Sequence, residues 1–233
     1  QNEQHGGQAI PAFDFFMAKG VAKSFRKHLA SFINFYVAME NGNQADEKSI
    51  RTLIKEYLPS IKSTEAERET LRIALVALQI IIDKEHLARI VEKAYQQTRK
   101  DTHQAMEGFI HNLNTMHSRG GNQVVFSSIN YGTDTSAEGR MVIEELLKAT
   151  IEGLGTRGEV PVFPIQIFKV KDGVSYSEKD FEKAMKAENI EEAMTDSYEA
   201  PNFDLLLKAC QTTAKALFPN FMFLDTPFNK NEK

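Results

Sequence analysis

One continuous run, residues 112–135, constrains the fold of this chain more than any other part of the sequence. It begins at the end of an amphipathic helix and continues through a basic loop that contains two glycines, Gly120 and Gly121. The residues from Gln123 to Ser128 have the β-branched and aromatic character of a strand. A turn rich in hydroxyl and amide side chains follows. This order indicates an α/β protein with a polar site at the end of a strand.

The residues before this run predict helices. Apolar residues recur at three- and four-residue steps, which is the period of a helix with one buried face, and four helices are expected at about 11–40, 48–58, 65–83 and 84–116. Thr64 and Glu67 have the form of a capping box at the start of the third helix. That helix is apolar almost all round, so we expect it to be buried on most sides. A polar stretch near 98–102 would allow a kink in the fourth.

The residues after the run alternate between strand and helix patterns. Strands are expected at about 123–128, 162–170 and 218–224, with helices at about 136–150 and 202–217 and short helical pieces within 178–195. Thr135 with Glu138 forms a second capping box, and Asn202 is expected to cap the later helix. Such alternation predicts a sheet whose strand ends converge on one face, and ligands bind beyond the carboxyl ends of strands in these sheets.

Composition narrows the class of protein. A formal net charge of -4 over 233 residues argues against a chain-wide basic surface for nucleic acid. No apolar run reaches the ~18 residues of a membrane span. The one cysteine, Cys210, excludes an internal disulfide, and its apolar helical neighbours predict a buried thiol. His103 and His111 share a helix face without a Cys/His cluster beside them, so no metal site is expected.

The best candidate for a binding site is the end of the strand in the central run. Alternate side chains of a strand point to opposite faces, which places Ser128 and Asn130 on one face and Ser127 on the other. The alternative is a strand end that runs into an Asx turn without a ligand. Arg119 beside two glycines suits a phosphate or a loop with two conformations, whereas a helix cap with an exposed arginine is the plainer interpretation. His5, also beside two glycines, leaves a similar choice between a ligand contact and a surface loop.

Five segments in order carry a resemblance to a known family: residues 4–14, 102–114, 118–135, 162–171 and 217–221. They resemble the catalytic subunit of anaerobic ribonucleoside-triphosphate reductase, the glycyl-radical class of ribonucleotide reductase. The resemblance implies a ten-stranded α/β barrel made of two five-stranded halves. Residues 1–233 would be a single internal fragment of the catalytic domain, with 1–117 mainly helical and 118–233 an alternating part of the barrel.

The resemblance also implies an activity. The family reduces ribonucleoside triphosphates to deoxyribonucleotides, using a glycyl radical that generates a thiyl radical on a cysteine of a finger loop. Formate as reductant, nucleoside triphosphate effectors and a zinc ion held near the C-terminus of the complete protein are implied as well. So are a homodimer, an iron–sulfur activase that uses S-adenosylmethionine, and a cytoplasmic location. For the present residues we expect no bound cofactor or metal, no nucleic acid and no membrane.

By position, the resemblance assigns Ser127, Ser128 and Asn130 to the wall around the substrate ribose and phosphates. His5 and Asn220 are further candidates for lining the same cavity. The specificity loop that responds to effectors would comprise Ser118, Arg119, Gly120, Gly121 and Asn122. The two active-site cysteines of the family would lie before Gln1 and after Lys233, and the radical glycine further on. We therefore expect no catalytic residue in this fragment and no activity from it alone.

Two other functions stay open at this point. One is a nucleotide-binding or helical interaction module without catalysis, and the other is part of a different glycyl-radical enzyme. The run from Ser127 to Thr135 disfavours the second of these.

Overall fold

The computed structural model describes residues 7–41, 46–115 and 126–228. The chain divides into two compact units: a helical unit, Ala18–Thr102, and a sheet unit made of Gln1–Met17 and His103–Lys233. Two long helices, α2 (Phe13–Asn41) and α5 (Lys84–Thr115), begin in one unit and end in the other. In the described residues, no helix has the length and apolar character that crossing a membrane requires.

The helical unit has short helices between the two long ones: α3 (Glu47–Tyr57), α4 (Glu65–Leu75) and the 3₁₀ turn η1 (Val76–Leu78). The side chain of Asp46 accepts hydrogen bonds from two backbone N–H groups at the start of α3. The expected capping box of Thr64 and Glu67 is confirmed. Apolar side chains at helical spacing form the core of this unit, among them Val21, Phe25, Leu29, Ile33, Ile50, Ile54, Leu58, Leu71 and Leu75.

Two expectations about these helices have different outcomes. The helix expected at 65–83 ends at Leu75, because η1 and a left-handed Gln79 turn the chain there. The prediction that this segment is buried on most sides is wrong, since Ile73 is 61% and Ile81 is 80% exposed. By contrast, α5 continues as one helix through its polar middle. The buried hydroxyls of Thr98 and Thr102 donate to the carbonyls four residues earlier, so the polar stretch is satisfied within the helix.

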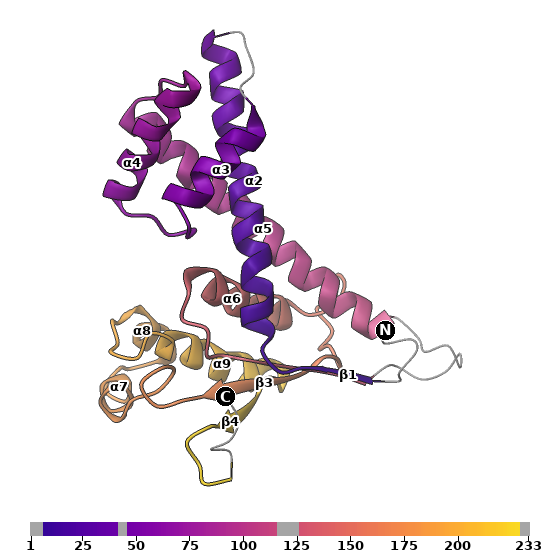
Figure 1. Cartoon of the computed structure of the whole chain (residues 1–233). Coiled ribbons are helices and arrows are strands. Elements are labelled where there is room, and N and C mark those ends of the chain that lie inside the picture. Colours follow the sequence, from indigo (N-terminus) through magenta and orange to yellow (C-terminus); the bar gives the residue numbers. More distant parts are fainter. Residues whose placement is uncertain (1–6, 42–45, 116–125, 229–233) are drawn as a thin grey trace. The chain divides into compact units, whose positions relative to one another are not determined.

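The sheet unit is built on four parallel strands in the order β1-β2-β3-β4 (Figure 1). The strands are β1 (Gly7–Ile10), β2 (Phe126–Tyr131), β3 (Ile165–Val170) and β4 (Asn220–Phe223). The helices of this unit are α6 (Ala137–Glu152), α7 (Glu178–Ala184), α8 (Ile190–Thr195) and α9 (Phe203–Ala216). Because the strands are parallel, their carboxyl ends lie at the same edge. The mixed α/β class, with a parallel sheet, is therefore confirmed.

The strands are offset in one direction as the sheet is crossed. The first residue of β3, Ile165, lies opposite the third residue of β2, Ser128. The first residue of β4, Asn220, lies opposite the third residue of β3, Ile167. The hydrogen-bond register is thus staggered by two residues at each of these two strand pairs.

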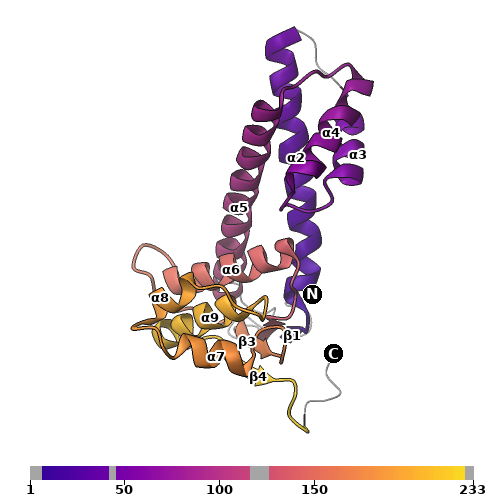
Figure 2. The ribbon, with the colours of Figure 1, turned by 90° about the vertical axis from the view of Figure 1, so that its left-hand side faces the viewer.

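One face of the sheet is covered by helices. Tyr131 and Gln166 point to this face, where the Tyr131 hydroxyl donates to Gln166 Oε1 at 2.8 Å. Gln166 Nε2 in turn donates to Thr150 Oγ1 of α6, also at 2.8 Å. Burial raises the pKa of Tyr131 well above its ordinary value, so its hydroxyl stays protonated and remains a donor. Helix α9 packs on α6 at this side of the sheet (Figure 2). We call this the covered face, and the opposite one the open face.

The turn after β2 is held from both sides. The buried carboxylate of Asp14, in the first turn of α2, accepts hydrogen bonds from the backbone N–H groups of Gly132, Thr133 and Asp134 at 2.9, 3.1 and 3.0 Å. The side-chain amide of Asn202 donates to the carbonyls of Gly132 and Asp134 at 3.1 and 2.9 Å. The polar backbone groups of a buried turn are thus satisfied by two distant side chains.

Glycine is required within this turn. Gly132 has a φ of +119°, and a Cβ atom there would lie 2.9 Å from the carbonyl oxygen of Lys169. The strand end at 132 therefore fits closely against β3.

Three local expectations in the sheet unit need correction. The N-cap of α6 is Ser136, which accepts from Gly139 N, and not Thr135. Asn202 stands at the N-cap position of α9 without a capping hydrogen bond, because its side chain is used by the turn after β2. Strand β1 was not expected. Its sequence, Gly-Gln-Ala-Ile, lacks an apolar pattern, and the strand exists through its pairing with β2.

We predict that Asp14→Ala lowers the free energy of unfolding by about 3 kcal/mol, because three N–H groups of the turn lose their acceptor. Asp14→Asn retains an acceptor oxygen and should cost less. Asp172→Ala, at an exposed aspartate of the same unit, is the matched control. Thermal and urea unfolding measure all three. Equal stability of Asp14→Ala and the control would contradict this account of the turn.

Burial of Asp14 also makes the stability of the fold depend on pH. Its pKa is raised mainly by burial, against the effect of the backbone hydrogen bonds from Asp134 and Gly132. The folded state therefore binds this proton more tightly than the unfolded state. The contribution of Asp14 to stability should fall as pH rises from its ordinary value of 3.8 through the raised one. Urea unfolding should show that the free energy of unfolding falls with rising pH across this window, and Asp14→Asn should remove that dependence on pH.

Candidate functional site

The open face of the sheet carries polar side chains on β2, β3 and β4. Asn130 lies opposite Ile167, and Ile167 lies opposite Asn220, so the two asparagines share one row across three strands. Two strand spacings of about 4.8 Å place their backbones roughly 10 Å apart. Ser128 lies on the same face two residues before Asn130, and both side chains are partly exposed. The predicted pairing of Ser128 and Asn130 on one face is confirmed.

Ser127 points to the covered face, as strand alternation requires, and is 5% exposed. A small pocket of about 50 Å³ lies there and is lined by Gln8, Ile10, Phe109, Leu113 and the β2 residues 127–129. Ser127 is therefore separated from Ser128 and Asn130 by the sheet itself.

Lys169 is a residue of the open face that the sequence pattern did not single out as a site. It follows Phe168 in β3, lies opposite Met222 and is only 4% exposed. Within the described part of the chain, its ammonium group has no ion pair or hydrogen bond. The side chain of Lys169 adds a positive charge to the open face, which favours an anionic ligand there. The signal in the sequence is a single charge inside the strand Ile-Gln-Ile-Phe-Lys-Val.

The backbone amides at the end of β2 are already occupied. Asp14 accepts from the amides of residues 132–134, and Asp134 Oδ1 accepts from Ser136 N at 2.8 Å. Asp134 and Glu138, both buried, add further carboxylates at the start of α6. An anionic ligand is therefore repelled from this turn and has to be bound by the side chains of the open face.

Other sequence candidates lie elsewhere. His5 and the loop of residues 118–122 fall outside the described residues. Cys210 is exposed on α9, so its predicted burial is wrong. The buried face of that helix is formed by Phe203, Leu205, Ala209, Thr212 and Ala216. Desolvation nonetheless raises the pKa of the thiol, which keeps it protonated and a poor nucleophile at neutral pH.

The helical unit carries a basic groove of about 600 Å³ between α2 and α3. Its lining includes Lys23, Arg26, Lys27, Lys48, Arg51 and Lys55, together with Gly20, Ser24 and Thr52. Arg51 forms an ion pair with Glu47 of its own helix. The groove has the size of a small-molecule site and a strong excess of positive charge, which suits a phosphorylated ligand.

These groups are suited to binding a ligand and not to covalent chemistry. The open face supplies a hydroxyl, two amides and an ammonium, which orient a polar, negatively charged small molecule. Among the described residues, the group suited to a metal ion is His103, Glu107 and Glu152, on helices of the opposite side.

Comparison with known proteins shows the family to which this chain belongs. The sequence profile of the anaerobic ribonucleoside-triphosphate reductase family matches residues 1–233. The protein of that name from Enterobacteria phage T4 is 28% identical over 140 residues, which cover 60% of this chain and 20% of the phage protein. The one from Escherichia coli strain K12 is 26% identical over 132 residues, which cover 57% of this chain and 16% of the relative.

A third relative with the same name, from Haemophilus influenzae, is 26% identical over 126 residues, which cover 54% of this chain and 15% of the relative. The matched part thus spans about a fifth or less of the length of these curated proteins. Because the family profile matches the chain from its first residue to its last, this protein belongs to the anaerobic ribonucleoside-triphosphate reductase family.

Proposed function

We propose that this chain is an internal part of the catalytic subunit of an anaerobic ribonucleoside-triphosphate reductase and contributes to its substrate site. The complete enzyme converts ribonucleoside triphosphates to deoxyribonucleotides by glycyl and thiyl radical chemistry. The observation that carries the proposal is the open face, where Ser128, Asn130, Lys169 and Asn220 come together in a chain of this family.

The sheet is proposed to form part of a ten-stranded barrel. The offset between β2 and β3 and between β3 and β4 runs in one direction, as the stagger of a closed barrel demands. Strands β1 and β4 are the two edges of the described sheet, and edges of this kind are usually paired or covered. We further propose the division into a mainly helical part, 1–117, and an alternating barrel part, 118–233.

Each side chain of the open face has a proposed role toward the substrate. The hydroxyl of Ser128 and the amide of Asn130 hydrogen-bond the ribose hydroxyls, and Asn220 reaches the same ligand from β4. Lys169 neutralises phosphate charge, which the occupied amides of the β2 turn cannot do. Ser127 supports this strand from the covered face. His5 is proposed to line the same cavity.

The radical steps are assigned to other parts of the complete enzyme. We propose that the glycyl radical, the thiyl radical, formate and the zinc ion act there, and that an S-adenosylmethionine-dependent activase generates the radical. Cys210 is not assigned to this chemistry, because its raised pKa and its position on α9 give it no activated thiolate.

Effector control is proposed for two places. Residues 118–122, the proposed specificity loop, begin three positions after Thr115, the last residue of α5. The last turn of α5 is fixed by Asn114. This side chain bonds the backbone of Val162 and Phe163 before β3. A loop that starts from a fixed helix end is suited to respond to a bound nucleotide. The basic groove between α2 and α3 is proposed to bind the triphosphate of an effector.

A homodimer of the complete enzyme is proposed to use the helical unit. Ile73, Val76 and Ile81 are 61%, 53% and 80% exposed, and large apolar side chains in water are typical of contact surfaces.

We predict that Asn130→Ala and Ser128→Ala each lower kcat/KM of the complete reductase roughly fivefold, the value of one neutral hydrogen bond of about 1 kcal/mol. Their melting temperatures should stay close to that of the parent. Asn112→Ala, at an exposed asparagine of α5, is the matched control. A large drop in melting temperature with unchanged kcat/KM would show that these residues act on the fold alone.

We predict that Lys169→Met leaves the melting temperature close to that of the parent, because methionine keeps the apolar part of this mostly buried side chain. The same variant should lower kcat/KM at least roughly tenfold, since a charge-assisted hydrogen bond to phosphate is lost. Lys171→Met, two residues further and exposed, should change neither quantity. Destabilisation of Lys169→Met with normal kinetics would contradict the proposed phosphate contact.

We predict that Lys27→Glu weakens binding of ATP to this chain roughly tenfold, as loss of a charge-assisted contact requires. ATP binding to the parent should also weaken when the salt concentration is raised from about 50 to about 200 mM, because the Debye length becomes roughly twofold shorter. Lys186→Glu makes the same change of charge at an exposed site of the sheet unit and is the control. Calorimetric titration measures these affinities, and equal binding by Lys27→Glu and the parent would remove the groove as a nucleotide site.

A further inference from the structure

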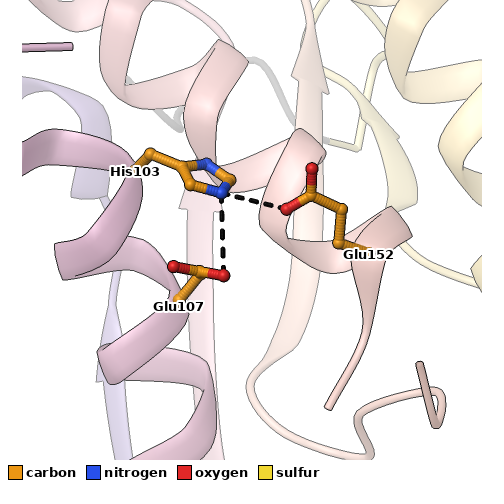
Figure 3. Close-up of side chains that lie close together, drawn as sticks. All are labelled: His103, Glu107 and Glu152. Carbon is orange, nitrogen blue, oxygen red and sulfur yellow. Dashed lines mark ion pairs between the residues drawn. The ribbon is translucent and has the colours of Figure 1, made fainter. Parts of the chain in front are cut away.

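A cluster of one histidine and three glutamates lies between α5 and α6, away from the open face. His103 and Glu107 are one turn apart on α5, whereas Glu145 and Glu152 are two turns apart on α6. All four belong to the sheet unit. Figure 3 shows the Nε2 edge of the imidazole facing both Glu107 and Glu152.

The distances suit a single metal ion. Nε2 of His103 is 2.9 Å from Glu152 Oε2 and 3.7 Å from Glu107 Oε1, and one ligand atom from each residue lies within 4.8 Å of the others. Two atoms that each lie about 2.1 Å from a zinc ion at a tetrahedral angle are about 3.4 Å apart. The observed separations lie on both sides of that value, so small side-chain adjustments would bring the three ligands onto one ion.

The other ring nitrogen of His103, Nδ1, faces a buried glutamate. Glu145 is 1% exposed, and its Oε2 lies 3.1 Å from His103 Nδ1. Nδ1 is buried and has no hydrogen bond of proper geometry among the described residues. A carboxylate behind the imidazole is a usual neighbour of a metal-binding histidine, and a small rotation of the ring would let Nδ1–H donate to Glu145 and leave Nε2 to coordinate.

Charge gives an independent reason for a cation. The carboxylates of Glu107 and Glu152 both face one imidazole nitrogen, and the ammonium group of Lys148 lies 3.9 Å from Glu152. A divalent ion would neutralise two of these charges and relieve the repulsion between Glu107 and Glu152.

We propose that His103, Glu107 and Glu152 bind one divalent transition-metal ion, with Glu145 as the positioning residue behind the histidine. One imidazole and two carboxylates match Zn²⁺ best among common ions and Mn²⁺ less tightly, whereas Mg²⁺ disfavours a nitrogen ligand. Three protein ligands leave a position for water. The ion would link the sheet-unit half of α5 to α6, and its role is structural.

The test is calorimetric titration of this chain with ZnCl₂, with MnCl₂ and MgCl₂ in parallel. One equivalent of Zn²⁺ should bind, more tightly than Mn²⁺, and Mg²⁺ should bind least. His103→Ala, Glu107→Gln and Glu152→Gln should each weaken Zn²⁺ binding at least roughly tenfold. Zn²⁺ should raise the melting temperature of the parent and not that of these variants.

His111→Ala is the matched control, because this histidine lies two turns further along α5 and is exposed. Its Zn²⁺ affinity should equal that of the parent. The two glutamine variants keep the shape of the side chains, so they still test the site if His103→Ala fails to fold. Absence of Zn²⁺ binding at millimolar concentration would overturn the proposal and leave His103 as a hydrogen-bonding neighbour of the carboxylates. Equal binding by the parent and the three site variants would also overturn it.

Discussion

The Asp14 carboxylate is the contact on which the arrangement of the site depends. It joins the first turn of α2 to three consecutive amides after β2, residues that are more than a hundred positions apart in sequence. Asn202 completes the same turn by bonding its carbonyls, and Arg140 holds Asn202 through its Oδ1 and also pairs with Asp204. The end of β2 is thereby fixed by the starts of α2, α6 and α9.

This arrangement decides where an anion can bind. A turn with several free amides is a common phosphate site, but here a carboxylate fills it. Donors for a ligand are therefore provided by the open face, where Ser128, Asn130 and Asn220 share one side of the sheet and Lys169 adds a positive charge. The offset of the strands is what brings the first residue of β4 into the same row as Asn130 near the end of β2.

Helix α5 begins in the helical unit and ends in the sheet unit as one continuous helix. Its polar middle stays helical because Thr98 and Thr102 bond back to carbonyls of the same helix. Its end is tied to the segment before β3 by Asn114, and its side by the contacts of His103 with Glu145 and Glu152. These contacts fix the last turns of α5 against α6 and the segment before β3.

The sequence by itself determined most of the helices, three of the four strands and the division of Ser127 from Ser128 and Asn130, because these follow from local periodicity. It also carried the family resemblance that the profile match confirms. It did not determine where the helix that begins at Glu65 ends. Only the tertiary structure decided the features that need distant partners. Strand β1 exists through pairing with β2, Asn220 joins Asn130 through register, and Asn202 serves the turn after β2 instead of its own helix. The burial of Lys169, the exposure of Cys210 and the meeting of His103 with Glu152 likewise depend on packing, which no local pattern encodes.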